Sequence, residues 1–178
     1  GNNGIGIAGV NWHAKIMPIK VFQSSGRGDA ATITQGIIYA ATHGATVINM
    51  SFGSYARSLT MEAALANAYA NTVLVAAAGN DNRSINKGPF YPAAISYVFG
   101  VQATQHNLNI TAKGFKKNTY LTDFTNYDQD GPVFSRYVDL LNYEMKAPGN
   151  GIISTIPNGN YRVYNGTSMA SPLLSGAV

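Results

Sequence analysis

Cysteine is absent from this chain of 178 residues, and only 11% of the residues are charged. Without cysteine, neither a disulfide framework nor a thiolate metal site is available. Globular domains have about 25% charged residues on average, so the low share here argues against a charge-laced surface or a disordered tail. No apolar run approaches the roughly 20 residues of a membrane-spanning helix, and no basic-then-apolar signal pattern opens the chain. We therefore expect no membrane span.

Positive charge is present but scattered, with a formal net charge of +4. Lys113, Lys116 and Lys117 are the only local concentration of basic residues. No stripe of basic residues alternates with aromatic ones, so we expect no nucleic-acid binding. The length suits one domain, and a hydrophobic share of 46% is enough to bury a sizeable core.

The first part of the chain alternates between predicted strands and predicted helices. Strands are expected at residues 15–22, 46–52 and 72–79, and amphipathic helices at 29–44, with Asp29 as the cap, and at 58–71. Strands that are apolar on both faces and alternate with such helices are typical of a parallel sheet covered on both sides. The fold class is therefore α/β. Chemistry is expected at the carboxyl ends of its strands.

The pattern loosens over residues 104–142, which are rich in Asn, Thr, Asp, Tyr and Lys. We expect strands and long surface loops there, with short apolar runs returning at residues 145–149 and 152–157. The chain opens in a loop-like sequence, GNNG, and stops within an apolar helical run. We interpret both ends as cuts through a larger domain.

Residues 165–172, with the sequence NGTSMASP, place Ser168 among small residues where a loop leads into a helical stretch. Small neighbours allow a substrate backbone to approach, and a helix N-terminus offers free N–H groups to a developing oxyanion. Ser168 is therefore a candidate nucleophile. In the alternative interpretation, Thr167 or Ser168 only caps the helix, and Pro172 lies in its first turn.

Asn80 follows a predicted buried strand that ends in AAAG. At that edge of the sheet, its side-chain amide is in position to donate to an oxyanion beside the backbone N–H of Ser168. An Asn after Gly is also a common turn residue, which is the alternative.

Four motifs together resemble the subtilisin-like serine peptidases, or subtilases. They are VINMSFG at residues 47–53, VAAAGN at 75–80, APG at 147–149 and YNGTSMASP at 164–172, in the order of the family. The resemblance covers residues 1–104 and 143–178 well and the middle poorly. It implies a three-layer α/β fold with a mostly parallel central sheet, incomplete at the N-terminus and truncated in the C-terminal helix. Residues 1–178 would be a partial catalytic domain with an enlarged loop region at about 104–142.

The resemblance also implies a site. Ser168 would form an acyl-enzyme during peptide hydrolysis, and Asn80 would complete the oxyanion hole. An extended substrate would pair with two chain segments and place one side chain in a pocket. The segments are Ser51, Phe52, Gly53 and, opposite, Gly26, Arg27, Gly28; the pocket is lined by Ala77, Ala78, Gly79, with Phe90 as its far wall. Phe90 stands where the family often has Gly, which predicts a short pocket that disfavours the largest P1 side chains.

Residues 2–7 resemble the calcium-binding loop of the family, with Asn3 as the side-chain ligand. Oxygen ligands suit calcium, so the resemblance implies a structural calcium ion, while the chemistry itself requires no cofactor. The alternative is an ordinary Asn-Gly turn. The resemblance further implies a secreted or cell-envelope protein.

The Asp and His motifs of the family do not occur in this sequence. His13, His43 and His106 do not match the position of the catalytic base. A serine without a base keeps an unactivated hydroxyl, so we expect this chain alone to be nearly inactive. Its expected partners are a protein or peptide substrate and the missing N-terminal part of its own catalytic domain.

Two other functions have different consequences. A subtilase-like domain that has lost catalysis would bind peptides or partners without cleaving them. A nucleotide-binding domain would need a Gly-x-Gly-x-x-Gly motif after the first strand, and Gly26-Arg27-Gly28 lacks that spacing.

Overall fold

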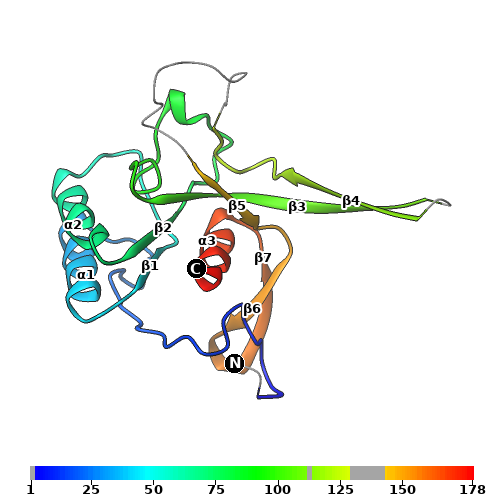
Figure 1. The fold of residues 1–178 in the computed structure, drawn as a ribbon, viewed down its shortest axis with the longest axis horizontal. Helices are drawn as coiled ribbons and strands as arrows, with labels where there is room; N and C mark the ends of the chain where they lie inside the picture. The colour runs from blue at the N-terminus through cyan, green and yellow to red at the C-terminus, as the bar shows by residue number, and fades with distance from the viewer. Residues whose placement is uncertain (1–2, 112–113, 129–142) are drawn as a thin grey trace.

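The computed structural model describes residues 3–111, 114–128 and 143–178 (Figure 1). Three helices and seven strands are defined within these residues. The helices are α1 (Ala30–Thr42), α2 (Leu59–Tyr69) and α3 (Thr167–Ala177). The strands are β1 (Val47–Met50), β2 (Val73–Ala77), β3 (Phe99–Thr111), β4 (Gly114–Leu121), β5 (Met145–Pro148), β6 (Ile152–Ile156) and β7 (Asn160–Tyr164). None of the helices in the described part is long and apolar enough to cross a membrane.

The central sheet is mostly parallel, as the sequence predicts. Its order is β1-β2-β3-β5, and all three of these pairings are parallel. The register aligns Val47 with Val73 and Val101 with Met145. β4 pairs antiparallel with β3, and β6 and β7 form a separate two-stranded sheet.

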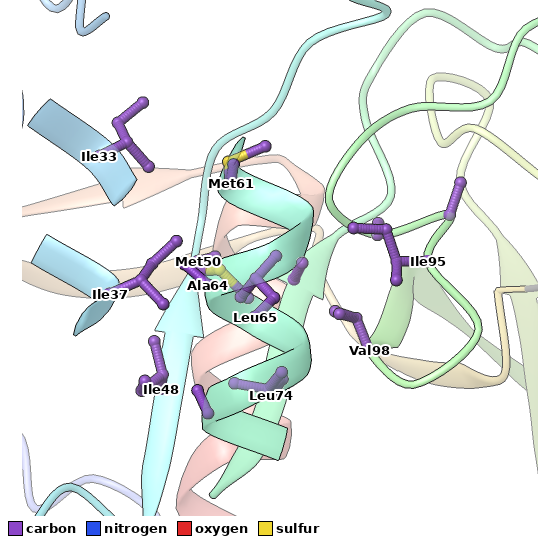
Figure 2. Packing of buried hydrophobic residues seen from close by; sticks show 14 of the residues in the cluster. Ile33, Ile37, Ile48, Met50, Met61, Ala64, Leu65, Leu74, Ile95 and Val98 are labelled. Atoms are coloured by element: carbon purple, nitrogen blue, oxygen red, sulfur yellow. The ribbon is translucent and has the colours of Figure 1, made fainter. Parts of the chain in front are cut away.

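Helices cover both faces of the sheet and give three layers. On one face, side chains of α1, α2, β1 and β2 form the larger core cluster, part of which Figure 2 shows. Within β2, Leu74 and Ala76 belong to that cluster, whereas Val75 points to the other face. There it packs in a second cluster with Ala170 of α3. This alternation on a strand that is apolar throughout confirms the predicted doubly covered sheet.

The first two helices begin at side-chain caps. Asp29 Oδ1 accepts a hydrogen bond from the backbone N–H of Thr32 at 2.8 Å, and Ser58 Oγ accepts one from Met61 N at 3.4 Å. The bond from Thr32 N lowers the pKa of the Asp29 carboxyl. Both caps satisfy N–H groups that have no partner within the helix.

The predicted strand at residues 15–22 is wrong. The structure assigns no strand there, although Ile19, Val21 and Phe22 pack partly buried against the larger core cluster. The apolar spacing of this segment therefore reflects packing of side chains on the core and not backbone pairing. Strand pairing needs an aligned partner as well as an apolar face, and a spacing pattern reports only the second.

The loosely patterned region contains a long hairpin. β3 and β4 pair from Thr104 with Leu121 to Thr111 with Gly114, and Figure 1 shows this hairpin extending away from the layered body. Within the predicted enlarged loop region, residues 112, 113 and 129–142 lie outside the described residues. β7 also forms a strand in a stretch for which we predicted none.

Candidate active site

Three chain segments meet at the carboxyl edge of the parallel sheet. One segment follows β1, one lies at the end of β2 and the third begins α3. Together with Phe90 they surround a pocket of about 190 Å³. The pocket is lined by Phe52, Gly53, Ala77, Gly79, Asn80, Asp81, Phe90, Thr167 and Ser168. The structure thus brings both predicted catalytic residues together with five of the predicted substrate-binding residues. Ala78 is fully buried and does not line this pocket.

Ser168 lies in the first turn of α3. The residue before the helix is Gly166, with φ at 154°, a backbone conformation that L-residues with side chains rarely adopt. The cap position of α3 is occupied by Gly166, and Thr167 and Ser168 are the first two residues inside the helix. The interpretation that Thr167 or Ser168 only caps the helix is therefore wrong. Among the described residues, the backbone N–H of Ser168 has no hydrogen-bond partner. A free N–H at a helix N-terminus is suited to an anion.

Asn80 is oriented by Thr167. The backbone N–H and the hydroxyl of Thr167 both donate to Asn80 Oδ1, each at 2.9 Å. The Thr167 hydroxyl in turn accepts a bond from the backbone N–H of Gly79 at 3.2 Å. Because two donors hold the oxygen of the amide, the Nδ2 group of Asn80 is the end left to donate to a ligand.

A reciprocal pair of hydrogen bonds joins Ser168 to Ser51. Ser168 Oγ donates to the backbone oxygen of Ser51 at 3.1 Å, and Ser51 Oγ donates to the backbone oxygen of Ser168 at 3.0 Å. Pro172, expected in the first turn, lies further inside α3. It has no N–H with which to reach the oxygen of Ser168 four residues earlier. The Ser51 hydroxyl therefore supplies the donor that the helix lacks at this position.

Asn49 extends this contact along α3. Its Nδ2 group donates to Ser51 Oγ at 2.9 Å, and its Oδ1 accepts bonds from the hydroxyls of Ser171 and Ser175. One amide thus ties two turns of α3 to the end of β1. Helix α3 is fixed relative to the sheet by polar groups as well as by the core.

The three histidines are engaged elsewhere. His43 Nδ1 lies 2.8 Å from the backbone oxygen of Tyr39 at the end of α1, and its ring stacks on that of Tyr39. His106 Nδ1 lies 2.9 Å from Thr119 Oγ1 on the hairpin. The backbone N–H of His13 donates to Asn11 Oδ1 in the N-terminal segment. In the described part of the chain, Ser168 Oγ bonds to a carbonyl and to no histidine.

Comparisons with known proteins identify the family of this chain. A family model described as the subtilase family matches residues 1–178. The chain belongs to the subtilase family. It is 40% identical over 176 residues to the cell wall-associated protease of Bacillus subtilis (strain 168), an alignment that covers 99% of this chain and 17% of that protein. It is 36% identical to subtilisin BL of Lederbergia lenta, covering 99% of this chain and 56% of that protein.

A solved structure shows the same similarity in fold. Sphericase superimposes with a TM-score of 0.73 at 30% identity, over 88% of this chain and 50% of that one. The chain thus spans between 17% and 56% of the length of the relatives named here.

Phe90 lines the pocket of this subtilase, and its ring lies against two glycines. A Cβ atom built on Gly53 would collide with that ring, and one on Gly79 would lie 3.2 Å from its Cδ1 atom. Only glycine at residue 53 therefore lets the ring come this close to the segment after β1. The structure thus places Phe90 in the lining of the pocket, and its role toward a substrate side chain stays a prediction.

The segment Gly26–Gly28 lies in a turn and does not line the pocket. Gln23 N donates to the oxygen of Arg27, and Gly26 N donates to the oxygen of Gln23, both at 2.9 Å. The turn is connected to the pocket through two aromatic rings. The ring of Phe22, just before the turn, meets the ring of Phe52 edge-on, with centroids 5.1 Å apart. The two predicted substrate segments are thus connected through aromatic packing.

Asn3, the predicted calcium ligand, lies in an exposed N-terminal segment. Its Oδ1 accepts a bond from Ile5 N at 3.5 Å. Calcium takes six to eight oxygen ligands, and no group of three or more His, Cys, Asp or Glu residues that could hold a metal occurs in the described part of this subtilase. Calcium binding at Asn3 stays a prediction.

The sequence did not indicate Asn126, which is fully buried beside the site. Its Oδ1 accepts bonds from the backbone N–H groups of Asp81 and Arg83 at 3.0 and 3.1 Å. Its Nδ2 donates to the backbone oxygen of Ala78 at 2.9 Å and to the hydroxyl of Tyr55 at 3.1 Å. Asn126 lies in the region where the motifs of the family are weakest, so no spacing could have connected it to the pocket.

Proposed function

We propose that this chain carries the nucleophile and oxyanion hole of a serine endopeptidase that cleaves peptide bonds through an acyl-enzyme at Ser168. The observation that supports this most strongly is the orientation of Asn80, because Thr167 holds its oxygen and leaves its N–H₂ group beside the start of α3. With the free N–H of Ser168, it provides two donors for the oxyanion of a tetrahedral intermediate.

The base and the carboxylate that orients it would come from a segment outside these 178 residues. In subtilisin, loss of the base lowers turnover on the order of a million-fold, so the isolated chain would be nearly inactive. Exposed apolar side chains are consistent with a missing neighbour: Ile5 and Ile16 are 79% and 83% exposed. Such a surface favours association with a complementing segment. A monomeric, cooperatively unfolding isolated chain would contradict this part of the proposal.

The substrate would be a protein or peptide in extended conformation. The segment Ser51–Gly53 continues past the end of β1 with Gly53 exposed, as strand-like pairing with a peptide requires. Because the Phe90 ring closes the pocket, small P1 side chains would be preferred. Cleavage of a peptide library led by Phe and Tyr at P1 would count against this preference.

Calcium binding at Asn3 and a secreted or cell-envelope location complete the proposal. Bound calcium stabilises the form that binds it, so calcium would raise the melting temperature. Asn3→Ala would remove most of that increase if Asn3 is a ligand. An equal increase in both proteins would contradict its role.

The decisive test is labelling by a fluorophosphonate probe, in a form of the protein that also supplies Asp and His. We expect labelling of the wild type and of Ser154→Ala, a control at an exposed serine on β6, and no labelling of Ser168→Ala. Labelling that survives Ser168→Ala would refute Ser168 as nucleophile. A non-catalytic peptide-binding domain is the second candidate, because Ser168 Oγ is held by a carbonyl here. It predicts peptide binding with no labelling of the wild type.

A further inference from the structure

We propose that Tyr55 is a positioning residue that sets the depth of the pocket by holding the Phe90 ring across its far end. This inference rests on the proposed peptidase function and concerns the same pocket. It names a residue outside the lining of the pocket that determines which substrate side chains are accepted.

The backbone of Phe90 is fixed independently of its ring. Phe90 N donates to the hydroxyl of Tyr143 at 3.2 Å, and the oxygen of Phe90 accepts a bond from Ala94 N at 2.9 Å. These bonds leave rotation about the side-chain torsions of Phe90 open. The direction of the ring must therefore be determined by what packs against it.

Among the described residues, Tyr55 is the one whose ring forms an aromatic pair with that of Phe90. The two rings meet edge-on, with centroids 5.0 Å apart and an interplanar angle of 70°. The glycines at residues 53 and 79 lie against the Phe90 ring but have no side chains to hold it. An edge-on aromatic pair is a directional contact, so Tyr55 favours one orientation of Phe90.

Tyr55 is itself held by three groups. Its hydroxyl donates to Asp81 Oδ2 at 2.7 Å and accepts from Asn126 Nδ2 at 3.1 Å, and the guanidinium of Arg83 lies 4.5 Å from the centroid of its ring. Burial, followed by the bond to Asp81, raises the pKa of the Tyr55 hydroxyl, so the group stays protonated and able to donate. Tyr55 is therefore a fixed support although about a third of it is exposed.

The support is continuous with the catalytic segment. Asp81 directly follows Asn80, and Asn126 holds the backbone of Asp81 and Ala78. The position of Tyr55 relative to the oxyanion donor is thus fixed by the loop that carries the donor. The pocket that remains is suited to small, uncharged P1 side chains such as that of alanine.

The experiment uses a form of the protein that also supplies Asp and His, and it compares two peptide substrates that differ only in Ala or Phe at P1. We expect the wild type to favour the Ala substrate in kcat/KM. Tyr55→Ala should shift the ratio toward the Phe substrate by about tenfold, the scale on which small volume changes in a pocket alter selectivity. Tyr55→Phe, which keeps the ring but not the hydroxyl, should shift it less. Tyr39→Ala, which removes an exposed ring from α1, should leave the ratio unchanged.

The outcomes separate the two proposals. If the wild type cleaves both substrates and Tyr55→Ala has the wild-type ratio, the role of Tyr55 is refuted while the peptidase function stands. If the wild type cleaves neither, the function is refuted and the role of Tyr55 with it. If Tyr55→Ala does not fold, Tyr55→Phe decides: a ratio equal to that of the wild type refutes the hold exerted through Asp81 and Asn126. A Tyr55→Phe ratio shifted toward the Phe substrate supports it.

Discussion

Replacing Ser51 with alanine tests how the nucleophile is held in place. The backbone oxygen of Ser168 has no donor four residues later in α3, because Pro172 has no N–H group, and the Ser51 hydroxyl donates to it at 3.0 Å. Ser51→Ala removes the only side-chain donor to this oxygen in the described part of the chain. The bond from Ser168 Oγ to the backbone of Ser51 is not removed directly, so the change acts on the helix that carries the nucleophile.

The expected loss follows from the burial of this oxygen. A buried carbonyl without a partner costs about 1–3 kcal/mol. Because Ser168 is only half-buried, water replaces part of the lost bond, and we expect about 1–2 kcal/mol. If the lost bond displaces Ser168 Oγ and the activation free energy rises by the same amount, kcat falls about 5- to 30-fold. KM should change little, since the Ser51 hydroxyl points to α3 and not to the substrate.

The matching variant is Pro172→Ala. It introduces an N–H four residues after Ser168 that can donate to the same oxygen, and Pro172 is exposed, so the change leaves no cavity. The double variant Ser51→Ala, Pro172→Ala should therefore recover most of kcat. Ser54→Ala is the control, because Ser54 Oγ accepts from Ala56 N and does not contact Ser168.

The assay is steady-state hydrolysis of a chromogenic peptide by a form of the protein that also supplies Asp and His, with melting temperatures measured in parallel. Strictly additive effects of the two substitutions would refute the reasoning, because a shared acceptor requires them to be coupled. A Ser51→Ala variant with wild-type kcat and melting temperature would refute it as well.

Two further predictions concern Thr167 and Glu144. Thr167→Val removes the hydroxyl bond to Asn80 Oδ1, a net contribution of about 0.5–1.5 kcal/mol, and should lower kcat about 2- to 13-fold with KM unchanged. Thr167→Ser keeps the hydroxyl and should retain activity. An equal loss in both variants would contradict the role of the hydroxyl. Burial raises the pKa of the Glu144 carboxyl above its ordinary value of 4.5, so the folded state binds this proton more tightly than the unfolded state. Its contribution to stability is then complete below pH 4.5 and lost as the pH rises through the raised pKa. Glu144→Gln, whose oxygen can still accept from Gly100 N, should lessen the fall in melting temperature between about pH 4 and pH 8; an identical fall in both proteins would contradict the assignment.

The sequence predicts those features that depend on local spacing. Patterns among adjacent residues predict the covered sheet and the helices that begin after Asp29 and Ser58. They also predict the change from loop to helix at Ser168. The strand predicted at residues 15–22 is wrong because this prediction also used only local spacing. Apolar spacing does not distinguish a segment that packs its side chains on the core from one that pairs with a neighbouring strand.

The contacts that organise the site join residues far apart in sequence. Ser51 and Ser168 are separated by 117 residues, and Asn126 reaches Tyr55 across 71. Each of these residues has an ordinary local interpretation as a turn or loop residue. Their roles follow only from the way the sheet brings the ends of β1 and β2 to the start of α3.

The hydrogen bonds that hold the site predict its pH dependence. Those that fix Ser168 and Asn80 join neutral groups: hydroxyls, amides and backbone atoms of Ser51, Asn49 and Thr167. None of these groups changes charge between about pH 5 and pH 9, so the geometry of nucleophile and oxyanion donor should be constant over that range. A single transition near the pKa of a histidine should then describe kcat/KM, and it should report the base alone. Thr167→Val and Ser51→Ala should lower the height of this profile and leave its midpoint in place. A shifted midpoint in either variant would mean that these neutral contacts also set the pKa of the base.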